Sequence, residues 1–328
     1  MKVSALIITF NHGRFIEEAI QGFLRQETDF PCELLIADDG STDETRDVIR
    51  RYGQEYGDRI RVLLNPSNLG ARRTMIRAYH ACRGQYVATS DGDDYWTSPD
   101  KLQRQAEMLD RHPEYALCFH SVRMVWDDGG REPMIFRPRR IKEAYTLKNL
   151  FDHNFIASCS PMYRRGLFDR HPAWCFDVPV YDWMQHVLHA QYGTIGYIDE
   201  PMAVYRQHGG GVYSMSGAVE RLDVAIEMLK RFRPAFARKY RRAIDTSLCK
   251  HYCTLTHQYC DEGRLAEARR CIRQCLRAVR VLPLIPVGGL LKATVRAYAP
   301  GLHRRCKWIL VKSQCLPAAS GRGRADPH

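Results

Sequence analysis

Short apolar runs alternate with amphipathic segments along the first hundred residues of the chain. The runs are rich in β-branched and aliphatic residues, which is typical of strands buried on both faces of a parallel sheet. Between the runs, apolar residues recur at helical spacing, as Ile16, Ile20 and Phe23 do. The predicted strands are 3–10, 32–39, 60–65 and 85–91, and the segments with helical character are 14–26, 40–52 and 67–84. Ser41 and Glu44 have the spacing of a capping box for the second helix.

Repeated strand–helix alternation predicts an α/β fold with a mostly parallel, doubly wound sheet, because each connection is long enough for a crossover helix. The same logic extends the pattern beyond Pro99. The further predictions are a helix to about Arg111, a strand at 115–126, a helix, strand and turn over 147–168, a helix at 181–193, and a strand leading into a glycine-rich loop over 194–213.

The chain changes character near residue 216, where long arginine-rich helices begin. Residues 217–328 hold 23 Lys and Arg against 8 Asp and Glu, whereas residues 1–216 hold 26 against 29. We therefore expect a domain at 1–215 and a basic helical extension at 216–328 that faces something anionic. Within the extension the pattern predicts a helical hairpin at about 236–280, a membrane-contacting segment at 281–312 and a disordered tail at about 316–328.

The cysteines and the apolar runs bear on the compartment. The twelve cysteines are irregularly spaced and no signal sequence is recognisable, so we expect reduced thiols in the cytoplasm. No apolar stretch approaches the length of about 18 residues that a membrane-spanning helix needs. A further group is predicted to share the faces of two helices, where packing is favoured over a zinc site: Cys249, Cys253, His257, Cys260, Cys271 and Cys275.

Polar residues cluster where three of the predicted strands end, at Thr9–Asn11, Asp38–Asp39 and Asp91–Asp94. In a doubly wound sheet the ligand lies beyond the carboxyl ends of the strands, so these clusters are expected to share one crevice. The third cluster, in "SDGDDYW", concentrates three carboxylates in four positions. Mg²⁺ and Mn²⁺ prefer oxygen ligands of this kind, and Gly92 lets the backbone approach a ligand closely. A turn of solvated aspartates is the alternative.

Several motifs, in order, resemble those of the family 2 glycosyltransferases, which have the GT-A fold. They are "IITFNHGRFIEEAIQGFLRQ", "LLIADDGSTDET", "NLG", "SDGDDYW" and "YIDEPMAVYRQHGGGV", and the resemblance covers about 1–215. It implies a nucleotide-sugar donor, a divalent metal (Mn²⁺ or Mg²⁺) on the donor diphosphate, and inversion at the anomeric carbon. The donor expected from the family is a UDP-sugar.

The resemblance also implies roles for individual residues. Asp91 and Asp93 match the metal-binding element, with His208 as a third ligand or a diphosphate contact, and Asp94 would support the metal shell or orient the sugar. A second set would bind the nucleotide-sugar: Thr9, Phe10 and Asn11 around the nucleoside, Asp38 and Asp39 facing base and ribose, Arg73 near base or phosphates, and Gly92 in the turn with Asp91 and Asp94.

The resemblance implies that the base that takes the proton of the acceptor hydroxyl lies at the start of a helix. Here "VYDWMQHVLHAQYG" supplies Asp182, although an aspartate at that place also complements the helix dipole. Trp183 would stack on an acceptor sugar or pack in the core. Alternatively, His208 is a surface histidine without a role in binding.

These observations predict an inverting transferase that extends a growing glycan or a lipid-linked oligosaccharide, on the cytoplasmic face of an anionic membrane and without nucleic acid as a partner. Two alternatives stay open. A nucleotidyltransferase would need a glycine-rich basic loop after the first strand, and "TFNHGRF" lacks one. A non-catalytic adaptor would use the basic helices and would have no intact acidic site.

Overall fold

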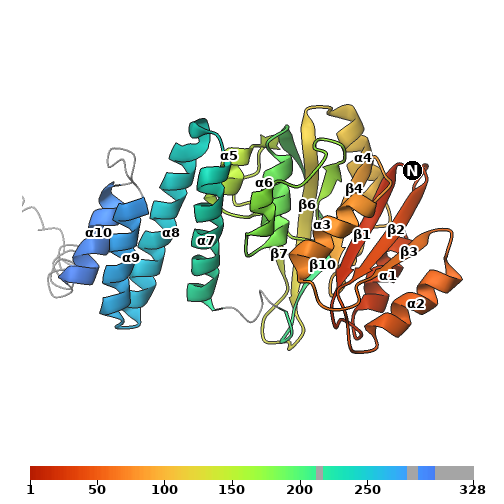
Figure 1. Cartoon of the computed structure of the whole chain (residues 1–328), viewed down its shortest axis with the longest axis horizontal. Coiled ribbons are helices and arrows are strands. Elements are labelled where there is room, and N and C mark those ends of the chain that lie inside the picture. The colour runs from red at the N-terminus through yellow and green to blue at the C-terminus, as the bar shows by residue number, and fades with distance from the viewer. Residues whose placement is uncertain (212–216, 279–286, 300–328) are drawn as a thin grey trace, which may run out of the picture. The chain divides into compact units, whose positions relative to one another are not determined.

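The computed structural model of the protein describes residues 1–211, 217–278 and 287–299 (Figure 1). These residues form two compact units, which divide between Ser247 and Leu248. Each unit is described on its own below.

The first unit is built on a ten-stranded sheet whose N-terminal half is wholly parallel, as predicted. Its strands lie in the order β3-β2-β1-β4, and helices connect them in sequence. The bounds are β1 Val3–Thr9, α1 Ile16–Leu24, β2 Cys32–Asp38, α2 Thr45–Glu55, β3 Ile60–Leu64, α3 Ala71–Ala81 and β4 Tyr86–Asp91. All four strands therefore end at the same edge of the sheet.

The other half of the sheet is mixed. The short β9 (Met162–Arg164) lies antiparallel between β4 and β6 (Tyr115–Trp126), and β10 (Thr194–Gln207) runs parallel to β6. The remaining strands pair antiparallel: β5 (Tyr95–Trp96) and β8 (Ala144–Tyr145) with β10, and β7 (Met134–Phe136) with β6. The α/β class with a mostly parallel central sheet is confirmed, and the short strands β5, β7, β8 and β9 run against the main direction.

The burial of β1 on both faces explains why its sequence is apolar except at Ser4 and Thr9. Ile7 belongs to a core cluster with α1 residues such as Ile16, whereas the adjacent Leu6 and Ile8 pack with Met75 of α3. Successive side chains of a strand point to opposite faces, so a strand covered on both faces has no polar face to show. The sheet is thus rigidly held just where its strand ends carry the polar clusters.

The capping box predicted for α2 is wrong, because the helix begins at Thr45. The Ser41 hydroxyl instead accepts the Asn11 backbone N–H at 2.9 Å. Asp43 accepts the Thr45 N–H at 3.1 Å. Ser41 therefore ties the β1–α1 loop to the β2–α2 loop, which no local spacing rule reveals.

The helices of the second half of this unit include two that border the site, α5 (Leu147–Asp152) and α6 (Tyr181–His189). The others are α4 Lys101–Arg111, η1 Ala173–Phe176, α7 Ala218–Ala235, η2 Arg238–Tyr240 and the start of α8 (Arg241–Asp261). The compact unit continues about thirty residues past the domain border expected near 215. The reason is apolar packing: Phe232 of α7 makes ring contacts with Phe151 and Trp183.

The second unit contains the rest of α8, followed by α9 (Leu265–Ala278) and α10 (Val287–Tyr298). A turn with Gly263 at φ +74° joins α8 to α9. The Cys249 thiol hydrogen-bonds to Cys253 and Cys275. Cys249, Cys253, Cys271 and Cys275 are buried, and buried free cysteines pack as small apolar residues.

Parts of the predicted extension lie outside the described residues. The segment expected at 281–312 overlaps the described α10, but 281–286 and 300–312 fall outside, as does the tail at 316–328. In the described part of the chain, no helix combines the length and apolar character needed to cross a membrane.

Candidate active site

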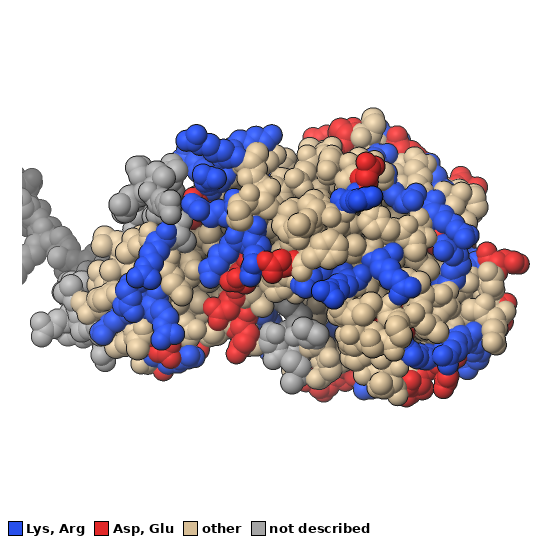
Figure 2. Space-filling model, in the orientation of Figure 1, with Lys and Arg blue, Asp and Glu red and all other residues tan. Residues whose placement is uncertain are grey.

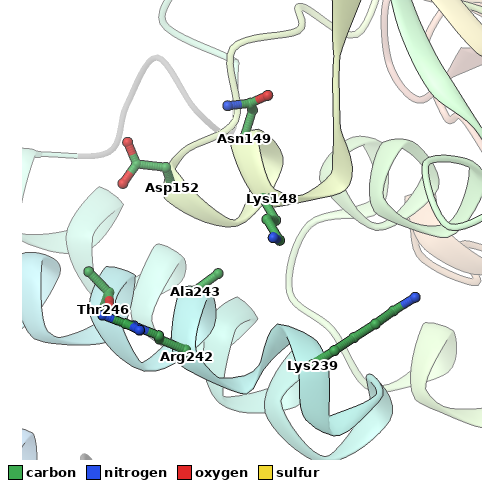
Figure 3. Close-up of a pocket in the computed structure, with 7 residues that line it drawn as sticks. All are labelled: Lys148, Asn149, Asp152, Lys239, Arg242, Ala243 and Thr246. Carbon is green, nitrogen blue, oxygen red and sulfur yellow. The ribbon is translucent and has the colours of Figure 1, made fainter. Parts of the chain in front are cut away.

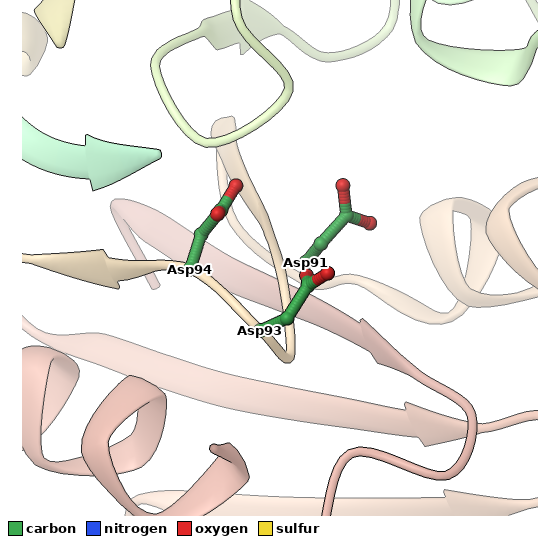
Figure 4. A group of neighbouring side chains, drawn as sticks. All are labelled: Asp91, Asp93 and Asp94. Atoms are coloured by element: carbon green, nitrogen blue, oxygen red, sulfur yellow. The ribbon is translucent and has the colours of Figure 1, made fainter. Parts of the chain in front are cut away.

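The acidic cluster occupies a tight turn at the end of β4. The Gly92 N–H donates to the Ile8 carbonyl at 2.8 Å, and the Asp94 N–H donates to the Asp91 carbonyl at 3.2 Å. This turn brings carboxylate oxygens of Asp91, Asp93 and Asp94 within 4.8 Å of one another (Figure 4). A Cβ atom on Gly92 would lie 2.6 Å from Thr9 Oγ1, so a larger residue would force the turn away from β1.

Burial and mutual repulsion make it costly for all three carboxylates of this cluster to be ionised at once. Burial, and then the charge of Asp93, raise the pKa of Asp91 to about 6. Burial and both neighbouring carboxylates raise the pKa of Asp94 well above its ordinary value. Burial also acts to raise the pKa of Asp93, but the hydrogen bond to His208 and the charges of His12 and His208 outweigh it and lower that pKa. A cation would allow all three carboxylates to ionise together.

The residues present fit a divalent cation. The second carboxylate oxygen of Asp94 is buried and has no hydrogen-bond partner among the described residues, and neither has Nδ1 of the nearby His12. Three carboxylates around one point are the donor set that Mg²⁺ and Mn²⁺ prefer. His208 lies at the cluster as predicted, with Nε2 3.0 Å from Asp93 Oδ2, while its Nδ1 accepts the Gly210 N–H at 3.2 Å.

Arg206, at the end of β10, holds the acidic turn in place. Its backbone N–H donates to Asp94 Oδ1 at 2.8 Å, and its guanidinium donates to the Asp93 carbonyl at 2.8 Å. The same guanidinium pairs with Glu18 of α1 at 2.7 Å and lies over the ring of Phe15. Sequence reasoning missed this residue, although it stands two positions before His208 in the quoted motif.

Helix α6 brings the predicted base to the same site. The Tyr181 hydroxyl donates a hydrogen bond to Asp91, and Asp182 is the next residue along the helix. One Asp182 oxygen accepts the Trp183 N–H, and the other accepts from Asn154 Nδ2 at 3.3 Å. Burial, with a smaller contribution from the Asp91 charge, raises the pKa of Asp182 to about 7. A carboxyl group with a near-neutral pKa is well matched to general-base catalysis.

Trp183 lies in the core instead of facing an open cleft. Its side chain is buried, with 4% of the residue exposed. The indole N–H donates to the Leu150 carbonyl at 2.9 Å, and the ring packs against Phe232. This placement favours the packing role over stacking on an acceptor sugar.

The two aspartates at the end of β2 organise the surrounding loops. Asp38 is fully buried, pairs with Arg46 at 2.7 Å and accepts the Gly40 N–H at 3.1 Å. Asp39 is also buried, and its Oδ1 accepts hydrogen bonds from Asn65, Leu69 and Thr74. Their direct contact with a nucleotide stays a prediction, whereas their structural role is visible.

Of the other residues predicted to bind the nucleotide, Phe10 and Asn11 line a cavity at the site, whereas Arg73 does not. Phe10 is 39% exposed, Asn11 adopts φ +54° and accepts the Thr42 N–H at 2.8 Å, and the buried Thr9 hydroxyl has no partner among the described residues. Arg73 is exposed near the start of α3. A cavity of about 510 Å³ next to the acidic turn is lined by Phe10, Asn11, His12, Arg14, Phe15, Asp127, His208, Gly209 and Gly210.

The fold and site together define an α/β protein with an acidic turn at the carboxyl end of its central parallel strands. A family model described as glycosyl transferase family 2 matches residues 4–171. The chain belongs to this family, which confirms the resemblance drawn from its motifs. Membership favours glycosyl transfer over the nucleotidyltransferase and adaptor alternatives.

The chain is similar to an uncharacterised protein and to a protein named as a glycosyltransferase. An uncharacterised protein of Mycobacterium tuberculosis is 41% identical over 212 residues, which are 64% of this chain and 60% of the relative. The match thus spans less than two thirds of that relative's length. A Bacillus subtilis glycosyltransferase named for teichuronic acid biosynthesis is 32% identical over 148 residues, covering 45% of this chain and 57% of its own.

Solved structures share the fold. S. aureus TarS 1–349 in complex with UDP-GlcNAc has a TM-score of 0.67 at 19% identity, covering 95% of this chain and 92% of its own. A Pyrobaculum calidifontis mannosyltransferase in complex with GDP-Man and Mn²⁺ has a TM-score of 0.58 at 19% identity, covering 95% and 84%. At these identities the likeness concerns the fold alone.

Proposed function

We propose that the protein transfers a sugar from a nucleotide-sugar, a UDP-sugar in the first instance, to a hydroxyl group of a growing glycan or lipid-linked oligosaccharide, with inversion. The observation that carries the proposal is the direct link between the two halves of the site. The Tyr181 hydroxyl bonds to Asp91, and Asp182 follows Tyr181 in the first turn of α6. A group for the donor diphosphate and a group for the acceptor proton thus share one site.

In the proposed reaction Asp182 accepts the proton of the acceptor hydroxyl as that oxygen bonds to the anomeric carbon. The bond from that carbon to the donor diphosphate breaks at the opposite face, and the electron pair leaves with the diphosphate. Asn154 and the Trp183 N–H hold one Asp182 oxygen each, which fixes the carboxylate while leaving lone pairs for the proton. The raised pKa means that Asp182 is a stronger base than an exposed aspartate when ionised.

Asp91 and Asp93 would hold Mn²⁺ or Mg²⁺, with Asp94 in support and His208 bonded to Asp93 or joining as a ligand. Such an ion, when bound, offsets the negative charge that grows on the leaving diphosphate. Arg206 fixes the turn that carries these carboxylates, so its guanidinium is a positioning group in this proposal.

Phe10 and Asn11 would contact the nucleoside, since they line the cavity beside the acidic turn. We further propose that the protein acts on the cytoplasmic face of an anionic membrane, where lipid-linked acceptors lie. The exposed Leu291 next to Lys292 on α10 is compatible with such contact.

The test is product stereochemistry. Full-length protein is incubated with Mn²⁺, a lipid-linked glycan extract and, one at a time, UDP-, GDP-, dTDP- and CDP-sugars, and NMR reads the anomeric configuration of the transferred sugar. We expect one donor class to be consumed and the configuration to be inverted. Retained configuration, or no turnover of any donor by folded protein, would contradict the proposal.

A further inference from the structure

A groove of about 440 Å³ lies away from the acidic site, between α5 and the start of α8. The groove is lined by the cationic side chains of Lys148, Lys239 and Arg242 (Figure 3), and we call it the basic groove. Asn149, Asp152, Ala243 and Thr246 complete the lining. All of these residues belong to the first compact unit, so the groove does not depend on how the two units are placed.

The cations of the basic groove are uncompensated. Lys148, Lys239 and Arg242 are exposed, and none forms an ion pair with another described residue. The one acidic lining residue, Asp152, has its carboxylate 3.7 Å from His153 Nδ1, and Figure 3 shows it pointing away from α8. Figure 2 shows Lys and Arg side chains gathered over the region where α7 is followed by α8 in Figure 1.

The lining of the groove offers an anion both cations and neutral hydrogen-bonding groups. Lys148 points from α5 towards α8, while Lys239 and Arg242 extend to either side of the groove (Figure 3). Arg242 and Ala243 lie in the first turn of the 21-residue α8, where the helix dipole adds positive potential. Asn149 and Thr246 add an amide and a hydroxyl that can bind phosphoryl oxygens. No aromatic side chain lines the groove, which argues against stacked bases of single-stranded nucleic acid.

The groove is coupled to the acceptor side through α5. The helix that carries Lys148 ends at Asp152, and Asn154, two residues further on, hydrogen-bonds Asp182. The carbonyl of Leu150 in the same helix accepts the Trp183 indole N–H. An anion in the groove would therefore be anchored on the element that supports the proposed base.

We propose that the basic groove binds a phosphoryl group, and that in the cell this group belongs to the acceptor. The assignment to the acceptor rests on the proposed function, whereas phosphoryl binding itself does not. The phosphoryl group could be carried by a lipid headgroup or by a soluble phosphorylated saccharide, since both present the same anionic oxygens. Arginine forms bidentate hydrogen bonds with such oxygens, so Arg242 is expected to contribute most.

The chain offers a matched control one residue away. Arg241 is exposed like Arg242 and starts the same helix, but it does not line the groove. Binding of inorganic pyrophosphate is measured by calorimetry in EDTA, with wild type, Lys148→Gln, Arg242→Gln and Arg241→Gln proteins. All four are also measured in an Asp91→Asn/Asp93→Asn background, which removes the carboxylates of the donor site.

We expect Arg242→Gln to weaken pyrophosphate binding at least tenfold, Lys148→Gln to weaken it severalfold, and Arg241→Gln to leave it within twofold, in both backgrounds. Equal binding by Arg242→Gln and Arg241→Gln proteins, or no binding by wild type, would overturn the proposal. So would tighter binding of a short oligonucleotide than of pyrophosphate that is lost in the same variants.

Flotation with phosphatidylglycerol vesicles then separates the sources. Loss of flotation in Arg242→Gln but not in Arg241→Gln protein supports a lipid phosphate, whereas unchanged flotation with lost pyrophosphate binding supports a soluble one. The proposed function is read separately, from donor turnover. Suppose that no nucleotide-sugar is turned over, but pyrophosphate binding is still weakened by Arg242→Gln and not by Arg241→Gln. The proposal for the basic groove is then supported, and the transferase proposal is contradicted.

Discussion

Replacing Asp182 by asparagine tests the role of the carboxylate with little change of shape. The substituted side chain can still accept the Trp183 N–H, so the start of α6 should keep its geometry. What it loses is the ability to take a proton. General-base catalysis contributes about 10²–10⁴-fold to a rate, and we expect kcat of the Asp182→Asn protein to fall by that factor while donor affinity is retained.

The raised pKa of Asp182 gives the prediction a pH dependence. With a pKa of about 7, the ionised fraction rises from about one tenth at pH 6 to about nine tenths at pH 8. If Asp182 is the base, the wild-type rate should rise about tenfold over this range. The residual rate of Asp182→Asn protein should lack this rise.

Stability supplies an independent readout with a defined sign. Burial raises the pKa of Asp182 to about 7, so between about pH 4 and pH 7 the folded protein holds a proton that the unfolded chain has released. The free energy of unfolding of the wild type therefore falls as the pH rises through this window, by up to about 1.4 kcal/mol per pH unit from this one group. Asp182→Asn protein lacks this contribution and should gain stability relative to wild type on going from pH 4 to pH 8.

The assay combines turnover at pH 6 to 8 with urea unfolding at pH 4 to 8. Asp177→Asn is the matched control, because Asp177 lies five residues earlier, is largely exposed and pairs with Arg231. That variant should keep wild-type rates and the wild-type pH profile. An Asp182→Asn protein with more than a tenth of the wild-type kcat at pH 8 would refute the assignment of the base.

Three further substitutions test other parts of the site. Gly92→Ala should lower activity, and it should lower stability by about 1–3 kcal/mol in thermal unfolding, because the new methyl group would meet Thr9 Oγ1 at 2.6 Å. Unchanged activity and stability would show that the turn is not tight. Trp183→Phe should cost about 1–2 kcal/mol in urea unfolding through the lost indole hydrogen bond while KM for the acceptor stays constant, and a selective rise in that KM would restore the stacking role. Asp38→Asn should destabilise the protein by about 3–5 kcal/mol because it breaks the ion pair with the half-buried Arg46. A loss of nucleotide affinity without a loss of stability would instead support a direct contact between Asp38 and the nucleotide.

The strands of the sheet could be predicted because burial on both faces leaves a local mark. Apolar residues dominate 3–10 and 32–39, and β1 (Val3–Thr9) and β2 (Cys32–Asp38) form within these segments. The acidic turn could be predicted for the same reason, since three carboxylates after an apolar run are visible without a structure. The order of motifs then identified the family, and the resemblance led to the prediction of Asp182 as the base.

Pairings between distant segments could not be predicted, because no local pattern encodes them. Arg206 meets Asp93 and Asp94 more than a hundred residues away in sequence, and Tyr181 meets Asp91 at a separation of 90. The capping box at Ser41 failed for the same reason: its hydroxyl is already engaged by a backbone N–H from another loop. The basic groove likewise joins α5 to a helix some ninety residues later.

The role proposed for the acidic turn is to bind a nucleotide diphosphate through a metal ion. The most direct measurement is calorimetric binding of UDP, GDP, dTDP and CDP, each with and without Mn²⁺, to wild type and to Asp91→Asn/Asp93→Asn protein. We expect that one nucleotide, UDP in the first instance, binds tightly only with Mn²⁺ and that the double variant loses this binding. Binding that is independent of Mn²⁺ and equal in the double variant, or no binding by well-folded wild type, would contradict it.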